Sequence, residues 1–144
     1  MIAAPLTIAM DGPPIAKARP RFGRRHTYTP ARTLSFAHDF GWAAKAAMAG
    51  RKPFTGAVKI IARFELPIPT SWSARKRADA ITGEIHPTAK PDLDNFLKAV
   101  LDAINGIIVG DDVQVTEIRA KKIYGLAPKT VLTIEQADGR GVAA

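Results

Sequence analysis

Residues 90–106 read KPDLDNFLKAVLDAING, and they contain the most strongly patterned element of this 144-residue chain. From residue 93 onward, apolar side chains recur at the spacing of a single helix face. This stripe consists of Leu93, Phe96, Leu97, Val100, Leu101 and Ile104. Asn105 and Gly106 are residue types that end helices. We therefore predict an amphipathic helix over residues 93–104, packed by this stripe on the rest of the core.

The segments on either side of this helix predict a sheet and two further helices. Apolar or alternating runs predict strands at residues 5–10, 57–66, 113–124 and 130–134. The turn residues at 125–128 predict that the last two strands form a hairpin. Thr29 and Pro30 suit the start of a helix that ends at Gly50, and Ser71 can cap a short basic helix.

The resulting order is β-α-β-α-α-β-β, with no internal repeat and no linker. It predicts a single α+β domain over residues 1–144, with a mixed sheet, packed helices and a frayed tail from Ala137. Hydrophobic content of 47% and charged content of 24% are globular values. Cysteine is absent, which excludes disulfides, thiol catalysis and cysteine-ligated zinc. No apolar run is long enough to cross a bilayer and no signal peptide is evident, so we expect a soluble cytoplasmic protein.

The charge of the chain favours a polyanionic partner. Lys and Arg outnumber Asp and Glu by 21 to 13, giving a net charge of +8. Nucleic acid, an anionic membrane surface, or solubility alone can explain such an excess. Residues 17–32 contain no acid and read as an exposed basic loop. The candidate nucleic-acid contacts are Lys17, Arg19, Arg21, Arg24, Arg25, Arg75, Lys76, Arg77 and Lys90.

Acidic residues are concentrated around the predicted helix at 93–104. Five of the thirteen acids lie there: Asp92, Asp94, Asp102, Asp111 and Asp112. Asp92 and Asp94 lie at the helix start, where the helix dipole favours negative charge, so an ordinary capped N-terminus explains one of them. Lys98 lies four residues after Asp94 and can pair with it, while Asp102 is expected to be a solvated surface residue.

A second acidic pair, Asp111 and Asp112, follows this helix after a short connection. If residues 107–109 return as an extended segment, one of these side chains can lie beside the helix start. Three carboxylates that close together repel one another unless a cation neutralises them, and Mg²⁺ takes oxygen ligands. Such a cluster is typical of metal-assisted phosphodiester hydrolysis. The alternative is acids scattered over the surface.

Two other interpretations of the acids fail on residue type. A calcium-binding EF-hand loop that began at Asp92 would need Gly at its sixth position and Glu at its twelfth, but these are Leu97 and Ala103. An Asp-x-Asp phosphatase nucleophile normally ends an apolar strand. Residues 86–91, which read HPTAKP, are not strand-like.

Residues 90–106, followed by DDVQV at 111–115, resemble the RusA family of Holliday-junction resolvases. The specific part of the resemblance covers residues 86–122, and the turn at residues 12–14, the basic loop and residues 67–72 add weaker support. The segment at 75–90 is longer than in the shortest family members, and the tail after Glu135 has no counterpart.

The resemblance implies a small, dimeric, Mg²⁺-dependent endodeoxyribonuclease of bacteria and their prophages, in which Mn²⁺ can replace Mg²⁺. It implies that Asp92, Asp94 and Asp112 are the catalytic metal ligands and that Lys98 is a lysine of the active site. The implied partners are branched DNA and a second copy of the chain, without a membrane or small-molecule cofactor. The alternatives are a less selective branch or flap nuclease and a catalytically inactive DNA-binding protein.

Overall fold

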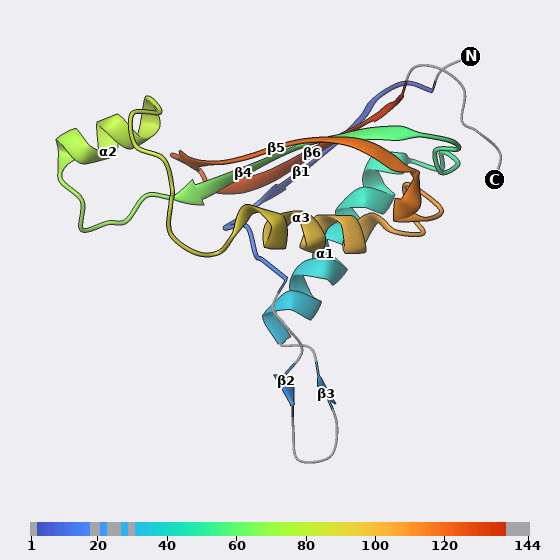
Figure 1. Cartoon of the computed structure of the whole chain (residues 1–144), viewed down its shortest axis with the longest axis horizontal. Helices are drawn as coiled ribbons and strands as arrows, with labels where there is room; N and C mark the ends of the chain where they lie inside the picture. The colour runs from blue at the N-terminus through green and yellow to red at the C-terminus, as the bar shows by residue number, and fades with distance from the viewer. Residues whose placement is uncertain (1–2, 18–20, 23–26, 29–30, 138–144) are drawn as a thin grey trace.

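A four-stranded mixed sheet with two helices on one of its faces forms the body of the protein in the computed structural model (Figure 1). The structure describes residues 3–17, 21–22, 27–28 and 31–137. The strands of the main sheet are β1 (Leu6–Asp11), β4 (Val58–Pro67), β5 (Val115–Gly125) and β6 (Lys129–Gln136). The helices are α1 (Ala31–Met48), α2 (Ala74–Ile81), α3 (Leu93–Ile104) and the short 3₁₀ helix η1 (Asp112–Gln114). The predicted α+β class and element order are confirmed.

The strand order of this sheet is β1-β6-β4-β5, so the predicted hairpin between the last two strands is wrong. β6 lies between β1 and β4 and is antiparallel to both, whereas β5 pairs only with β4, in parallel. Leu132 and Ile134 of β6 are fully buried, while β5 exposes most of its first half. The interior of the sheet therefore receives the more apolar strand, which removes more apolar surface from water than an edge position would.

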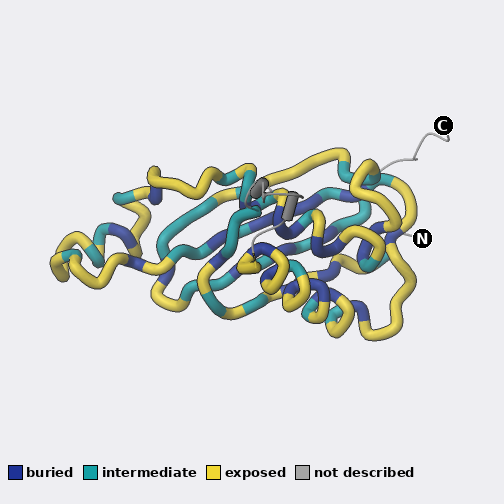
Figure 2. Tube along the Cα trace, turned by 90° about the horizontal axis from the view of Figure 1, so that it is seen from below, coloured by how far each residue is buried: buried dark blue, intermediate teal, exposed yellow. Residues whose placement is uncertain are grey.

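The core lies between the sheet and the inner faces of α1 and α3. Alternate residues of β4 from Val58 to Phe64 are buried, as a period of two requires for a strand covered on one face. Phe96 of α3 stacks on Phe64 with ring centroids 5.2 Å apart. Seen from the helix side, buried positions follow the strands and the inner sides of the two helices, while the region around α2 is mostly exposed (Figure 2).

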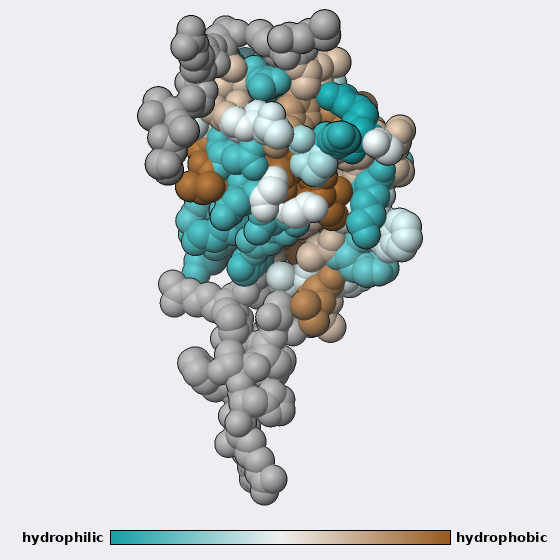
Figure 3. Space-filling view, turned by 90° about the vertical axis from the view of Figure 1, so that its right-hand side faces the viewer, coloured by the Kyte–Doolittle hydropathy of each residue, from teal (hydrophilic) through white to brown (hydrophobic). Residues whose placement is uncertain are grey.

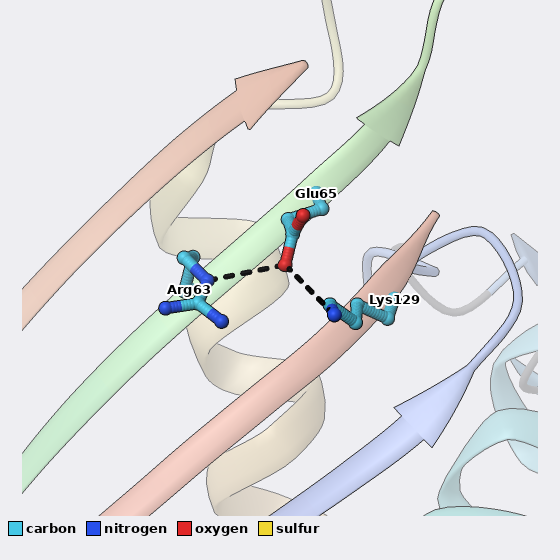
Figure 4. Close-up of polar contacts among 3 residues, drawn as sticks. All are labelled: Arg63, Glu65 and Lys129. Carbon is cyan, nitrogen blue, oxygen red and sulfur yellow. Dashed lines mark hydrogen bonds and ion pairs between the residues drawn. The ribbon is translucent and has the colours of Figure 1, made fainter. Parts of the chain in front are cut away.

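The other face of the sheet carries charged side chains that pair with one another. Glu65 Oε2 accepts a hydrogen bond from Arg63 Nε at 3.1 Å and lies 3.8 Å from Lys129 Nζ (Figure 4). On the same face, Lys59 Nζ lies 3.1 Å from Glu117. Neither α1 nor α3 covers this face, because the core stripe of each helix packs on the opposite one (Figure 1).

Several predicted element ends move by a few residues. Ser73, not Ser71, caps α2: its Oγ accepts a hydrogen bond from Lys76 N at 3.2 Å. Thr29 and Pro30, predicted to begin the first long helix, lie outside the described residues. The predicted basic loop contains two short paired strands, β2 (Arg21–Phe22) and β3 (Thr27–Tyr28). Among the described residues, no helix is long and apolar enough to span a bilayer.

Candidate active site

Asp92 lies at the N-cap position of α3, but its carboxylate does not cap the helix. Its backbone is extended, with φ −69° and ψ 149°, and its carbonyl accepts hydrogen bonds from Asn95 N and Phe96 N. The side chain makes no capping hydrogen bond and is exposed. A helix cap therefore does not account for this carboxylate, which is available to an external ligand.

Asp94, Lys98 and Asp102 follow one another at intervals of four residues along the exposed side of α3. Lys98 Nζ lies 3.8 Å from Asp94 Oδ2, and both side chains are more than 60% exposed. Asp102 is exposed as predicted, but it is not free, because Lys17 Nζ donates a hydrogen bond to its Oδ2. The backbone N–H of Lys17 also donates to Asn95 O at 3.0 Å. The start of the predicted basic loop is therefore attached to α3.

Asp111 and Asp112 lie in a tight turn that begins η1. Asp111 Oδ1 accepts a hydrogen bond from Val113 N at 3.2 Å and caps this short helix. A hydrogen bond with the Asp111 side chain, followed by burial and by the charges of Asp111 and Asp102, raises the pKa of Asp112 above its usual value. Negative charge is therefore concentrated at the C-terminal end of α3, where a cation or a proton stabilises it.

Gln114 holds this turn in place, and the sequence interpretation missed its role. Its Oε1 accepts hydrogen bonds from Gly110 N at 2.9 Å and Asp111 N at 3.2 Å. Its Nε2 donates to the carbonyls of Phe54 and Gly56, both at 2.9 Å. The spacing Asp-x-x-Gln at 111–114 matches a capping box, so this signal was present in the sequence.

The structure does not bring Asp112 to the start of α3, so the expected convergence within one chain is wrong. The N–H groups of Ile107 and Ile108 both bond to Ile104 O, and Gly106 N donates to Val109 O at 2.7 Å. With Ile108 and Val109 fully buried, the connection closes on the helix end instead of running back along it. Across the described part of the chain, no three His, Asp or Glu side chains are close enough to hold a metal ion.

A single chain therefore carries two acidic pairs at opposite ends of α3. Carboxylate oxygens are the ligand class that Mg²⁺ prefers, so each pair has suitable donors. A twelve-residue helix is about 18 Å long, however, and this separates Asp92 and Asp94 from Asp112. One chain alone does not assemble the three-aspartate ligand set. The end of the molecule that carries the Asp111–Asp112 turn shows hydrophilic and hydrophobic patches side by side (Figure 3).

Lys122 of β5 positions the segment that enters α3, and no sequence signal indicated this. Its Nζ donates to Ala89 O at 2.9 Å and to Pro91 O at 3.0 Å. These two carbonyls belong to the residues three positions and one position before Asp92. The ammonium group of Lys122 therefore ties the beginning of α3 to the edge strand of the sheet.

The predicted basic contacts fall into two groups. Arg19, Arg24 and Arg25 lie outside the described residues, and only the backbone of Arg21 is described. The second group lies on α2 and the segment after it: Arg75, Lys76, Arg77 and Lys90, of which all but Arg77 are exposed.

Two of the basic side chains on α2 have local partners. Lys76 Nζ lies 4.1 Å from the ring centroid of Trp72, whose ring packs edge-on against Tyr124. Arg77 donates a hydrogen bond to Pro69 O at 3.2 Å. Arg75 makes no such contact with the described residues, which leaves its guanidinium available to an external anion.

Comparison with known proteins identifies one family and one similar bacterial protein. The family model described as endodeoxyribonuclease RusA matches residues 11–135. The uncharacterized protein YqaN of Bacillus subtilis (strain 168) is 34% identical over 135 residues, which cover 88% of this chain and 93% of YqaN. The family match includes both acidic pairs, Lys98, Gln114 and Lys122.

Proposed function

This chain belongs to the RusA endodeoxyribonuclease family, and from this membership we propose that it resolves four-way DNA junctions by paired symmetric nicks. Endodeoxyribonuclease activity follows from the family. Selectivity for the junction, dependence on Mg²⁺ and a two-fold dimer are the further parts of the proposal. A symmetric dimer suits this substrate, because two active sites related by two-fold symmetry match a nearly two-fold symmetric junction.

The observation that carries the proposal is the free carboxylate of Asp92 at the start of α3. A side chain that neither caps the helix nor forms an ion pair has no structural task among the described residues. Asp94 adds a second exposed carboxylate two residues further on. We propose that Asp92 and Asp94 of one chain, together with Asp112 of the second chain in the proposed dimer, hold Mg²⁺, or Mn²⁺ in its place. When bound, such an ion supplies an activated water and neutralises charge on the phosphate.

Lys98 is proposed to contact the phosphate group that is cut. Its ammonium lies 3.8 Å from Asp94, in the same exposed row of α3. At this separation and exposure the ion pair contributes little to stability, so the ammonium can turn to a phosphate oxygen at small cost. A cation held beside the scissile phosphate offsets negative charge that develops in the transition state. The remaining Lys and Arg contacts would supply most of the affinity for DNA.

The test is a nicking assay on an immobile four-way junction, compared with duplex, flap and single-stranded DNA of the same sequence. We expect cleavage of the junction in Mg²⁺ or Mn²⁺ and no cleavage in EDTA. Equal cleavage of flaps and junctions would favour a less selective branch nuclease. Binding without cleavage under every metal condition would favour a catalytically inactive DNA-binding protein.

Substitution of the aspartates separates catalysis from binding. Asp94→Asn keeps the side-chain size and removes the charge, so we expect the nicking rate to fall by about 100-fold or more while junction affinity is kept or increased. Asp102→Asn is the matched control on the same helix, because it makes the same change of charge at an exposed residue to which we assign no ligand role, with loss of the pair to Lys17. A folded Asp94→Asn protein that cuts at the wild-type rate would refute the site assignment.

A further inference from the structure

Trp72 lies in the turn between β4 and α2, and several contacts hold its ring in place. Its backbone N–H donates a hydrogen bond to Pro69 O at 3.2 Å, and Arg77 of α2 donates to the same carbonyl at 3.2 Å. The ring packs edge-on against Tyr124 of β5, with the ring centroids 5.2 Å apart. Lys76 Nζ lies over the ring, 4.1 Å from its centroid. The indole is therefore fixed in position without any ligand.

This turn lies at the end of the sheet where α3 begins. Tyr124 follows Lys122 by two residues on β5, so the two side chains lie on the same face of the strand, about 7 Å apart along it. That face carries α3, because the register partner of Lys122 is the core residue Phe64. Lys122 in turn bonds to the carbonyl immediately before Asp92. Trp72 therefore lies at the same end of the molecule as the first two proposed metal ligands.

We propose that Trp72 stacks on an unpaired base of the DNA strand near the cut, while Lys76 and Arg75 contact the phosphates next to that base. Every base has a flat π-face that an aromatic ring can cover. In an intact duplex these faces are covered by the neighbouring bases, whereas a branch point can expose them. Trp72 would then favour branched DNA over duplex. That the ligand is DNA rests on the proposed function.

The charge of α2 suits the backbone of such a strand. The first four residues of this helix include Arg75, Lys76 and Arg77 and no acid. Because the helix dipole disfavours positive charge at this end, the stability of α2 does not account for these residues. The helix projects beyond the body of the protein, where a bound strand can reach it (Figure 1 and Figure 2). Basic side chains beside an aromatic ring are the combination that binds single strands with little sequence preference.

The ammonium group of Lys76 covers the face of the Trp72 ring that a base would occupy. The Lys76 side chain is exposed, and a cation–π contact at an exposed site is weak. A base can therefore displace the ammonium at small cost. The displaced ammonium stays within the length of its own side chain from the ring, where it can reach a phosphate oxygen of the stacked nucleotide.

Trp42 of α1 is the second of the two tryptophans in the chain, and it is the internal control. It is 61% exposed, and Lys45 Nζ lies 5.2 Å from its ring centroid. Its indole N–H donates to His38 Nε2 at 3.2 Å. These partners both belong to α1, so among the described residues these contacts do not link Trp42 to the segment that carries Asp92. We expect this ring not to stack on DNA, although it is well exposed.

Tryptophan fluorescence tests the stacking without any cleavage. Trp42→Phe leaves Trp72 as the single indole, and Trp72→Phe leaves Trp42, so each variant reports on one ring. In EDTA, a saturating four-way junction or single-stranded oligonucleotide should quench most of the emission of Trp42→Phe, because a stacked base quenches indole fluorescence. Blunt duplex of the same sequence should quench little, and the emission of Trp72→Phe should stay nearly unchanged. Quenching of Trp42 alone, no quenching, or equal quenching of Trp72 by duplex and junction would overturn the proposal.

Affinity measurements separate stacking from charge. Trp72→Leu keeps an apolar side chain and removes the aromatic ring, so junction affinity should fall by about fivefold or more, with the same slope of log K against log salt. Duplex affinity should change by less than about twofold, and Trp72→Phe should keep most of the junction affinity. Lys76→Gln should weaken both DNAs and reduce the slope by about 0.9, the share of one phosphate contact. Equal losses for junction and duplex in Trp72→Leu, with a lower melting temperature, would mean that the ring only anchors α2.

The stacking role and the proposed function fail in different experiments. If the wild type shows the expected quenching but cuts no DNA in Mg²⁺, the nuclease function is refuted and the stacking role stands. If the wild type cuts junctions selectively and Trp72→Leu binds and cuts them equally well, the stacking role is refuted and the nuclease function stands.

Discussion

Gln114 uses both polar atoms of its side-chain amide to connect two loops, so a single truncation should affect stability and activity together. Gln114→Ala removes four hydrogen bonds to Phe54, Gly56, Gly110 and Asp111. We expect the free energy of unfolding to fall by about 1–3 kcal/mol, since the group is partly exposed and water replaces some of these bonds. Nicking should fall by about tenfold or more, because Asp112 is no longer held in place.

Urea denaturation and a single-turnover nicking assay measure the two effects of Gln114→Ala. Gln114→Glu is the informative second variant. It keeps the oxygen that accepts from the turn but sets a second carboxylate oxygen against the carbonyls of Phe54 and Gly56. It should therefore also be less stable than the wild type. Full activity of a folded Gln114→Ala protein would show that this turn does not position a site residue.

Substitutions of the neighbouring residues Lys122 and Lys121 can separate the effect of positioning the α3 entrance from the effect of removing a positive charge. Lys122→Met keeps the apolar stem and loses the two bonds to Ala89 O and Pro91 O, so the entrance to α3 is released. We expect nicking to fall by about tenfold or more with little change in melting temperature. Lys121→Met removes the same charge from the neighbouring, exposed residue and should act close to wild type. Equal losses in both variants would assign the effect to charge and not to positioning.

At the scale of the element, α3 packs one face against the core and carries Asp92 and Asp94 of the candidate site at its start. Phe96 is fully buried and stacks on Phe64, so Phe96→Ala should lower the free energy of unfolding by about 3–5 kcal/mol. Leu126→Ala, in the exposed turn after β5, is the control and should change it by less than about 0.5 kcal/mol. Both are measured by denaturant titration. A small effect at Phe96 would mean that α3 does not pack on β4 as described.

The elements also show which features could be predicted from the sequence. The bounds of α3 were predicted correctly. The apolar stripe is a local pattern of the sequence, and it does not depend on which strands the helix packs against. The pairing of β5 was not, because the turn at 125–128 carries no information about which strand fills the interior of the sheet. The roles of Lys122 and Gln114 depend on carbonyls more than thirty residues away in the chain.

The candidate site also has one part whose position could be predicted from the sequence and one part whose position could not. Asp92 and Asp94 belong to a recognisable motif at the start of α3, and they lie where that motif placed them. The position of Asp112 depends on how tightly residues 105–110 close after the helix. The hydrogen bond from Gly106 N to Val109 O closes this connection, and no residue type in the segment predicts that bond.

At the scale of the whole molecule, the charge is unevenly distributed. The net charge is +8, but part of it is offset within the fold, as on the sheet face where Glu65 pairs with both Arg63 and Lys129 (Figure 4). The unbalanced positive charge lies in residues 17–32 of the sequence, on α2 and on β5. A polyanion should therefore contact few regions strongly instead of the whole surface weakly.

Salt dependence measures how many phosphates these regions contact. If about six to ten phosphates are neutralised, junction affinity should fall by about 10³–10⁵ between roughly 50 and 200 mM salt, because each contact releases counterions. Arg24→Gln combined with Arg25→Gln should lower affinity and reduce the slope of log K against log salt by about 1.8, the share of two contacts. Fluorescence anisotropy of a labelled junction at several salt concentrations measures both quantities. Arg75→Gln with Lys76→Gln is the comparison, since it removes the same charge from α2. If only the α2 substitutions reduced the slope, the main DNA-contact surface would lie on α2. A flat salt dependence in the wild type would exclude phosphate contacts as the source of affinity.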